Sequence, residues 1–173
     1  MTNRKSKSTI KTAFILLFGA VGMGWLYLTG AQINGAETRD ALIAAIWSHV
    51  GHGVILAPFL LAYALWRASN KPFHFSAPTS LTHLNKLIGW LLIASVAFLV
   101  LSGPFVVWTH GFPLKVFDWF VIQNPISKHQ AIHDQLEAAH VSIAKTIPWV
   151  LGADILTLAV MTSLRQLRRV TQT

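Results

Sequence analysis

Long apolar runs alternate with short polar segments along this chain, and these runs determine the predicted architecture. The runs lie at about 12–30, 44–67, 82–109 and 137–163. Each is about 20 residues or longer, which is the length that an α-helix needs to cross the roughly 30 Å hydrocarbon core of a bilayer. The pattern therefore predicts an all-α integral membrane protein, in which residues 1–173 form one bundle of four transmembrane helices.

The composition favours the same class of protein. Hydrophobic residues make up 53% of the 173 residues and charged residues 12%, which leaves too little polar surface to cover a soluble globule. The first run follows several basic residues, as the apolar part of a signal peptide does. It continues through Trp25, Leu26 and Tyr27, so we expect a retained helix and not a cleaved leader.

Basic residues gather at one set of predicted helix ends. That set comprises Arg4, Lys5, Lys7, Lys11, Arg67, Lys71, Lys86, Arg165, Arg168 and Arg169, and the opposite set comprises Arg39, Lys115 and Lys128. Because Lys and Arg near helix ends stay in the cytoplasm, both termini are expected to be cytoplasmic. We attribute the net charge of +8 to topology and to anionic lipid headgroups. Nucleic-acid binding is not expected, since these residues form no stripe with interleaved aromatics.

The connection at about 110–136 differs from the other, plainly polar connections. It contains GFPLKVFDWF, in which bulky apolar side chains are mixed with Pro, Lys and Asp. This mixture predicts a segment at about 112–124 that lies in the membrane interface and covers whatever the helices bind. The same connection holds His110, His129 and His133, which we interpret as solvated or partner-facing because their spacing lacks the compact geometry of an HExxH metal site.

Two histidines are the main candidates for a functional site. His49 and His140 each lie about one turn inside the outer end of an apolar helix, where an ionisable or metal-binding side chain is costly and therefore suggests function. Neutral imidazoles from two facing helices can hold a b-type haem as its axial metal ligands. The chain has no cysteine, which excludes disulfides, covalent c-type haem, iron–sulfur clusters and thiol catalysis.

Residues around these histidines complete the predicted haem site. Gly51 and Gly53, in the segment SHVGHGV, would leave space for a macrocycle. His52 lies about 4.5 Å deeper than His49 and is rotated by about 60° on the helix; we interpret it as a packed or propionate-contacting residue, with iron ligation as the alternative. Lys145 is expected either to extend to the outer headgroups or to pair with a haem propionate.

Three motifs resemble those of a known family. The first is SGPFVVWTHGFPLKVFDWF at 102–120, the second is ExxHxxxA at 137–144, and the third is His49 and Gly53 as HxxxG followed by a basic helix end at Arg67. In this order, and over most of its length, the chain resembles the bacterial cytochrome b561 family of four-helix membrane b-type cytochromes. The resemblance implies two haems, of which the outer one would be held by His49 and His140.

The resemblance also implies a second, inner haem, but its ligand positions do not match. They fall near the start of the first helix, where this chain has Thr12 or Ala13, and on Asp154, fourteen residues after His140. We therefore expect a variant that retains only the outer haem. Asp154 shares a helix face with His140, about 21 Å further along. It is interpreted either as a proton relay or quinone partner, or as a group in a polar pocket with Thr157 or Thr12.

The resulting functional hypothesis is electron transfer in a bacterial inner membrane, a location that the resemblance and the short loops imply. A periplasmic donor would reduce the haem, and the electron would pass to ubiquinone or to a partner redox subunit of a respiratory chain. The donor would be a c-type cytochrome docked near Lys115 and Lys128, or superoxide, as the resemblance implies. The first alternative is a structural or anchor subunit of a larger membrane electron-transfer complex with a residual haem. Haem-free binding of lipid or quinone is a third.

Overall fold

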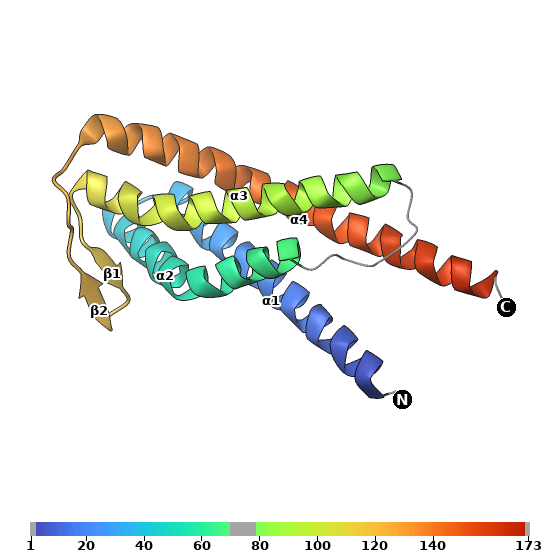
Figure 1. Cartoon of the computed structure of the whole chain (residues 1–173). Coiled ribbons are helices and arrows are strands. Elements are labelled where there is room, and N and C mark those ends of the chain that lie inside the picture. The colour runs from blue at the N-terminus through green and yellow to red at the C-terminus, as the bar shows by residue number, and fades with distance from the viewer. Residues whose placement is uncertain (1–2, 70–78, 172–173) are drawn as a thin grey trace.

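The computed structural model describes residues 3–69 and 79–171, with the side chains of residues 17–67, 80–164, 166–167 and 171. Across these residues the chain forms four helices, α1 (Asn3–Asn34), α2 (Arg39–Ser69), α3 (Thr79–His110) and α4 (Gln130–Val170). The four expected helices are therefore present, in the expected order. The start of α1 and the end of α4 lie at one end of the bundle, opposite the α3–α4 connection (Figure 1).

Each helix extends beyond the apolar run that predicted it. The α2 helix begins at Arg39 because the Thr38 hydroxyl accepts a hydrogen bond from the Ala41 amide and caps the first turn. The α4 helix begins at Gln130, where the His129 side chain accepts from the Ile132 amide in the same way. An apolar run predicts only the part of a helix that needs a nonpolar environment, so these polar first turns were not predicted.

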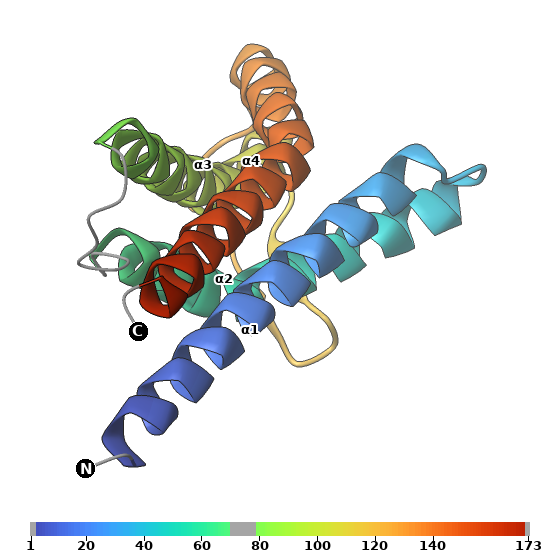
Figure 2. The ribbon, with the colours of Figure 1, turned by 90° about the vertical axis from the view of Figure 1, so that its right-hand side faces the viewer.

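The α4 helix buries one stripe of side chains with a period of seven residues. His133, Ile147, Asp154 and Met161 are buried, and His140 in the same series is half-buried. A seven-residue repeat keeps side chains on one face of a helix over several turns. Figure 2 shows α3 and α4 side by side and α1 running along α2. The stripe therefore places two histidines and a carboxylate inside the bundle.

The interior between the helices is apolar at mid-length, and much of the outer surface is apolar too. The buried cluster consists of Met23, Leu60, Tyr63, Ala64, Leu92, Val96 and Ile147. In the described residues, three helices are long and apolar enough to cross a membrane, namely Arg39–Arg67, Ser80–His110 and Gln130–Leu164. The first expected span, at about 12–30, lies in α1 and includes side chains outside the described set, so it stays a prediction.

The segment after α3 is a small β-hairpin, which was not predicted, although the chain as described is mostly helical and fits the expected all-α class. Strands β1 (Leu114–Val116) and β2 (Phe120–Ile122) pair antiparallel, with Lys115 opposite Val121. The side chains of Leu114 and Val116 are buried, whereas β2 is exposed along its length. Alternation over three residues is enough to bury one face of a strand, but it is too short a pattern to predict one.

Candidate functional site

The His49 ring is held in one orientation by a threonine from the neighbouring helix. Its Nδ1 lies 3.1 Å from Oγ1 of Thr29 on α1, and the Thr29 hydroxyl donates to the Leu26 carbonyl at 3.1 Å. Since the single hydroxyl proton is used in that bond, the Thr29 oxygen accepts from the Nδ1–H of His49. This network leaves the lone pair of His49 on Nε2, as in a metal-binding imidazole.

The His140 ring is held in the same way by a serine. Its Nδ1 lies 2.8 Å from Oγ of Ser102, a buried residue of α3. Both histidines thus use Nδ1 for a hydroxyl on an adjacent helix, which leaves Nε2 of each for a ligand. Neither Thr29 nor Ser102 could be predicted from the sequence, because a single hydroxyl in an apolar helix has no pattern that marks it.

The two imidazoles face each other between α2 and α4, with ring centres 6.4 Å apart and planes at 89°. A bond from a metal to an imidazole nitrogen is about 2.0–2.1 Å long and the nitrogen lies about 1.1 Å from the ring centre, so imidazoles on opposite sides of one metal have centres about 6.3 Å apart. The observed spacing matches this value. The structure therefore brings His49 and His140 together at a spacing at which both could hold one metal ion.

The two histidines lie at equal depths in their helices, but both lie further from the helix start than predicted. His49 comes ten residues after Arg39, where α2 begins, and His140 comes ten residues after Gln130, where α4 begins. Ten residues are nearly three helical turns, not the single turn expected. The error follows from the polar first turns that the apolar runs did not include.

Glycines provide space beside both rings. A Cβ on Gly30 would lie 3.3 Å from Cε1 of His49, and one on Gly103 would lie 3.6 Å from Cε1 of His140. A Cβ on Gly53, one turn after His49, would meet nothing within 4 Å, which fits its predicted role of leaving space for a cofactor. Gly51 has a different role, because its Cβ would lie 3.1 Å from the Phe117 ring of the hairpin turn.

The other predicted cofactor residues do not face the histidine pair directly. His52 has its Nδ1 2.7 Å from the Ser48 carbonyl, and its ring lies against Trp25 and Phe117, with centres 5.6 and 5.0 Å away. These ring contacts fit the packed role for His52. Lys145 is exposed on α4, as a side chain extending to headgroups would be.

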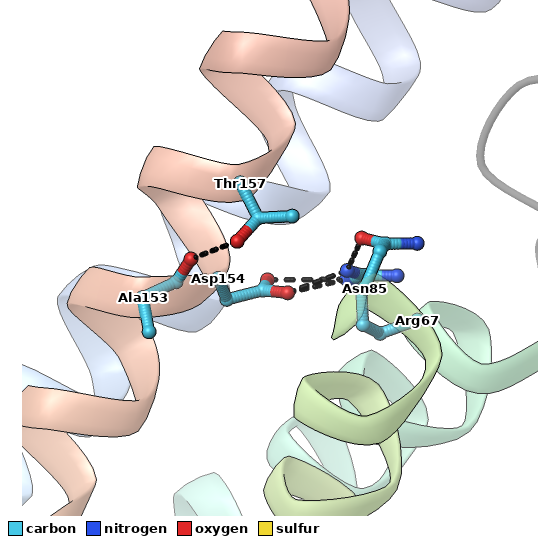
Figure 3. A network of polar contacts seen from close by, with 5 residues as sticks. All are labelled: Arg67, Asn85, Ala153, Asp154 and Thr157. Carbon is cyan, nitrogen blue, oxygen red and sulfur yellow. Dashed lines mark hydrogen bonds and ion pairs between the residues drawn. The ribbon is translucent and has the colours of Figure 1, made fainter. Parts of the chain in front are cut away.

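Asp154 lies in a buried ion-pair network that connects three helices (Figure 3). The Arg67 guanidinium on α2 donates through Nε to both carboxylate oxygens at 2.9 and 3.1 Å, and through Nη2 to Oδ1 at 2.5 Å. Nη2 also donates to the Asn85 side-chain oxygen on α3 at 2.6 Å. Arg67, Asp154 and Asn85 are only 4%, 0% and 2% exposed.

This network corrects the expectation for Arg67 and bears on that for Asp154. Arg67 does not contact headgroups at the helix end, because the carboxylate of Asp154 holds it inside the bundle. The hydroxyl of Thr157, one turn from Asp154, donates to the Ala153 carbonyl at 2.7 Å; the side chain of Thr12 lies outside the described set. A carboxylate that already accepts three bonds from one guanidinium is a poor partner for a quinone headgroup.

The remaining histidines are divided between the two ends of the bundle. His133 is not solvated, since it is 8% exposed and lies in α4 against the end of α3. His129 is the cap of α4, and His110 lies beside His133. His83 is exposed on α3, and His74 is outside the described residues. Within the part of the chain described, His83 forms no histidine pair with the geometry of His49 and His140.

The chain was compared with known families, proteins and structures. No family model, no curated protein and no solved structure matches this chain.

Proposed function

We propose that the chain is a membrane b-type cytochrome that holds one haem between His49 and His140. The single observation that supports this most strongly is the pair of facing imidazoles, whose centres are 6.4 Å apart and whose Nδ1 atoms are both taken by hydroxyls. Each Nε2 is then available to the iron. The open space at Gly53 fits a macrocycle next to His49.

A bound haem would supply reversible one-electron chemistry at its iron. The protein's part is to hold and orient the two ligands. Thr29 and Ser102 fix which nitrogen of each ring faces the iron and raise the basicity of the ligand, as partners outside the first coordination shell commonly do. The surrounding apolar helices exclude water, which influences the reduction potential of the haem.

The proposed route takes an electron from a periplasmic donor to quinone or to a partner redox subunit. It follows the resemblance to bacterial cytochrome b561, with the hairpin end in the periplasm and both termini in the cytoplasm of a bacterium. Lys115 is paired with Asp118 at 2.9 Å, so its charge is partly offset. Lys128 would therefore attract an anionic or acidic donor more strongly than Lys115 would.

One haem, not two, is part of this proposal. The inner half of the bundle contains the buried Arg67–Asp154 pair where the resemblance implies a haem ligand. This network also favours the alternative of an anchor subunit, because it connects α2, α3 and α4 without any cofactor. In that alternative the haem would chiefly stabilise the fold.

The test is the haem content of the purified chain, measured as the pyridine haemochrome, with difference spectra of His49→Ala and His140→Ala. We expect one b haem per chain, lost in either variant, and no change in the control His83→Ala, an exposed histidine of α3. Two haems, or a haem retained in both variants, would contradict the proposed site. Reduction of the purified chain by quinol or superoxide separates an oxidoreductase from an anchor, which would need its complex.

A further inference from the structure

A second group of imidazoles lies at the outer end of the α3–α4 pair, and the proposed haem site does not use it. His110 Nδ1 is 3.2 Å from His133 Nε2, and the two ring centres are 4.5 Å apart. Glu137, one turn after His133 on α4, places Oε2 3.5 Å from the same Nε2. Three ligand-type side chains from two helices therefore meet at one buried nitrogen.

The hydrogen bonds of His133 define its tautomer. Its Nδ1 lies 2.9 Å from the Val106 carbonyl, and a carbonyl can only accept, so the proton of the neutral ring is on Nδ1. Nε2 then carries a lone pair directed at His110 and Glu137. Metal-binding histidines typically have this arrangement, in which the second nitrogen donates to a backbone carbonyl or a carboxylate.

The spacing of the two rings also fits a shared metal. Two imidazoles bound to one ion at angles between 90° and the tetrahedral angle have nitrogens about 2.9–3.4 Å apart and ring centres about 4.5–5.1 Å apart. The observed separations of 3.2 and 4.5 Å fall in both ranges. An in-line N–H···N bond of that length would instead separate the ring centres by about 5.4 Å.

We propose that His110, His133 and Glu137 bind one divalent transition-metal ion, with zinc as the test ion, through Nδ1, Nε2 and the carboxylate. No three histidine or acidic side chains of the described chain are already arranged as a metal cage. An ion would therefore bind to the existing pair of imidazoles and attract the Glu137 carboxylate as its third ligand. That side chain is 57% exposed, and water would fill the remaining positions.

The chemistry of the three ligands determines which ions suit the site. Imidazole and carboxylate together suit zinc and copper, which bind such ligands more strongly than manganese or iron(II) does. When His110 binds the ion through Nδ1, its single ring proton would be on Nε2, so the ring would carry no charge.

The ion would also connect two helices near the haem site. His133 precedes His140 by seven residues on the same face of α4, which is about 10.5 Å. A metal that joins the end of α3 to α4 at this position would stabilise the outer end of the bundle. It would be separate from the haem ligands, so its test does not depend on haem binding.

The experiment is a zinc titration of the full chain in detergent, followed by calorimetry, after purification with a tag that contains no histidine. We expect one zinc per chain and a higher unfolding temperature with zinc. His110→Ala should weaken binding more than about a hundredfold, beyond the loss typical of a partner outside the first shell, and Glu137→Gln should weaken it by a smaller factor. The control is His83→Ala, an exposed histidine of the same helix, which should bind zinc normally.

Two outcomes would overturn the proposal. One is a His110→Ala variant that binds zinc as the unmodified chain does, and the other is an equal loss in His83→Ala. Copper(II) electron paramagnetic resonance gives an independent readout, because two coordinating nitrogens are expected in the unmodified chain and one in His110→Ala. Circular dichroism of each variant shows whether it has folded, so a failed fold is not mistaken for a lost ligand.

Discussion

Replacing Asp154 by leucine is expected to destabilise the bundle far more than replacing both members of its ion pair. The single change leaves the Arg67 guanidinium buried without its carboxylate, and Arg67 is only 4% exposed, so water offers little compensation. Removing one partner of a buried pair costs about 3–5 kcal/mol. Since about 1.4 kcal/mol is a factor of ten, the ratio of folded to unfolded protein should fall roughly a hundred- to several-thousand-fold.

The double variant Arg67→Met with Asp154→Leu removes both charges and keeps apolar side chains of similar size. Such replacements are neutral or stabilise by about 1–4 kcal/mol, so most of the loss should be recovered. Asn85→Ala should cost about 1–3 kcal/mol, because one guanidinium hydrogen bond is lost. Thr157→Val is the matched control, since Thr157 is one turn from Asp154 and bonds only its own helix in the contacts described here.

Reversible unfolding in sodium dodecyl sulfate, followed by circular dichroism, gives the free energy of unfolding of each variant. The reasoning predicts a strong coupling energy between Arg67 and Asp154 in the double-mutant cycle. It is refuted if Asp154→Leu costs less than about 1 kcal/mol, or if the double variant is no more stable than the two single variants. Either result would mean that the pair is hydrated in the folded protein.

The other predictions concern the haem site and the hairpin. Ser102→Ala and Thr29→Val each remove the partner of an Nδ1 atom, so haem affinity should fall about 10–100-fold, measured by transfer of haem to an apoprotein acceptor; unchanged affinity would show that these hydroxyls do not orient the ligands. Gly51→Ala should destabilise the chain by about 1–3 kcal/mol, because its Cβ would press on the Phe117 ring at 3.1 Å. Gly152→Ala, where the Cβ meets nothing within 4 Å, should stabilise it by up to about 1 kcal/mol, and equal effects of the two substitutions would contradict the hairpin contact.

The helical architecture could be predicted because the apolar runs are long and widely separated. Their lengths indicate helices, and their order gives the topology of a bundle. Helix ends could not be predicted, since polar caps such as Thr38 and His129 continue a helix beyond its apolar part. The error at the start of α4 placed His133 in a loop, although it lies in a helix and is buried.

The candidate residues fall into two groups. One group can be recognised from the pattern within a single helix, and the other depends on a partner from a distant helix. His49 and His140 were predicted because each is an unusual residue at the same depth in an apolar run. The Arg67–Asp154 contact joins residues 87 positions apart, and a basic residue near a helix end is ordinarily assigned to headgroups. Only the packing of α2 and α4 on their common neighbour α3 shows that this arginine turns inward, so no spacing in the sequence could have revealed the pair.

Electron paramagnetic resonance of the ferric protein tests the central proposal most directly, because it reports both axial ligands of a haem at once. The imidazole planes of His49 and His140 are at 89°, so the structure predicts a low-spin signal with the strong anisotropy that near-perpendicular axial imidazoles produce. His49→Ala and His140→Ala should each abolish that signal. A high-spin ferric signal in the unmodified protein, or a low-spin signal that survives either substitution, would contradict a haem held between these two histidines.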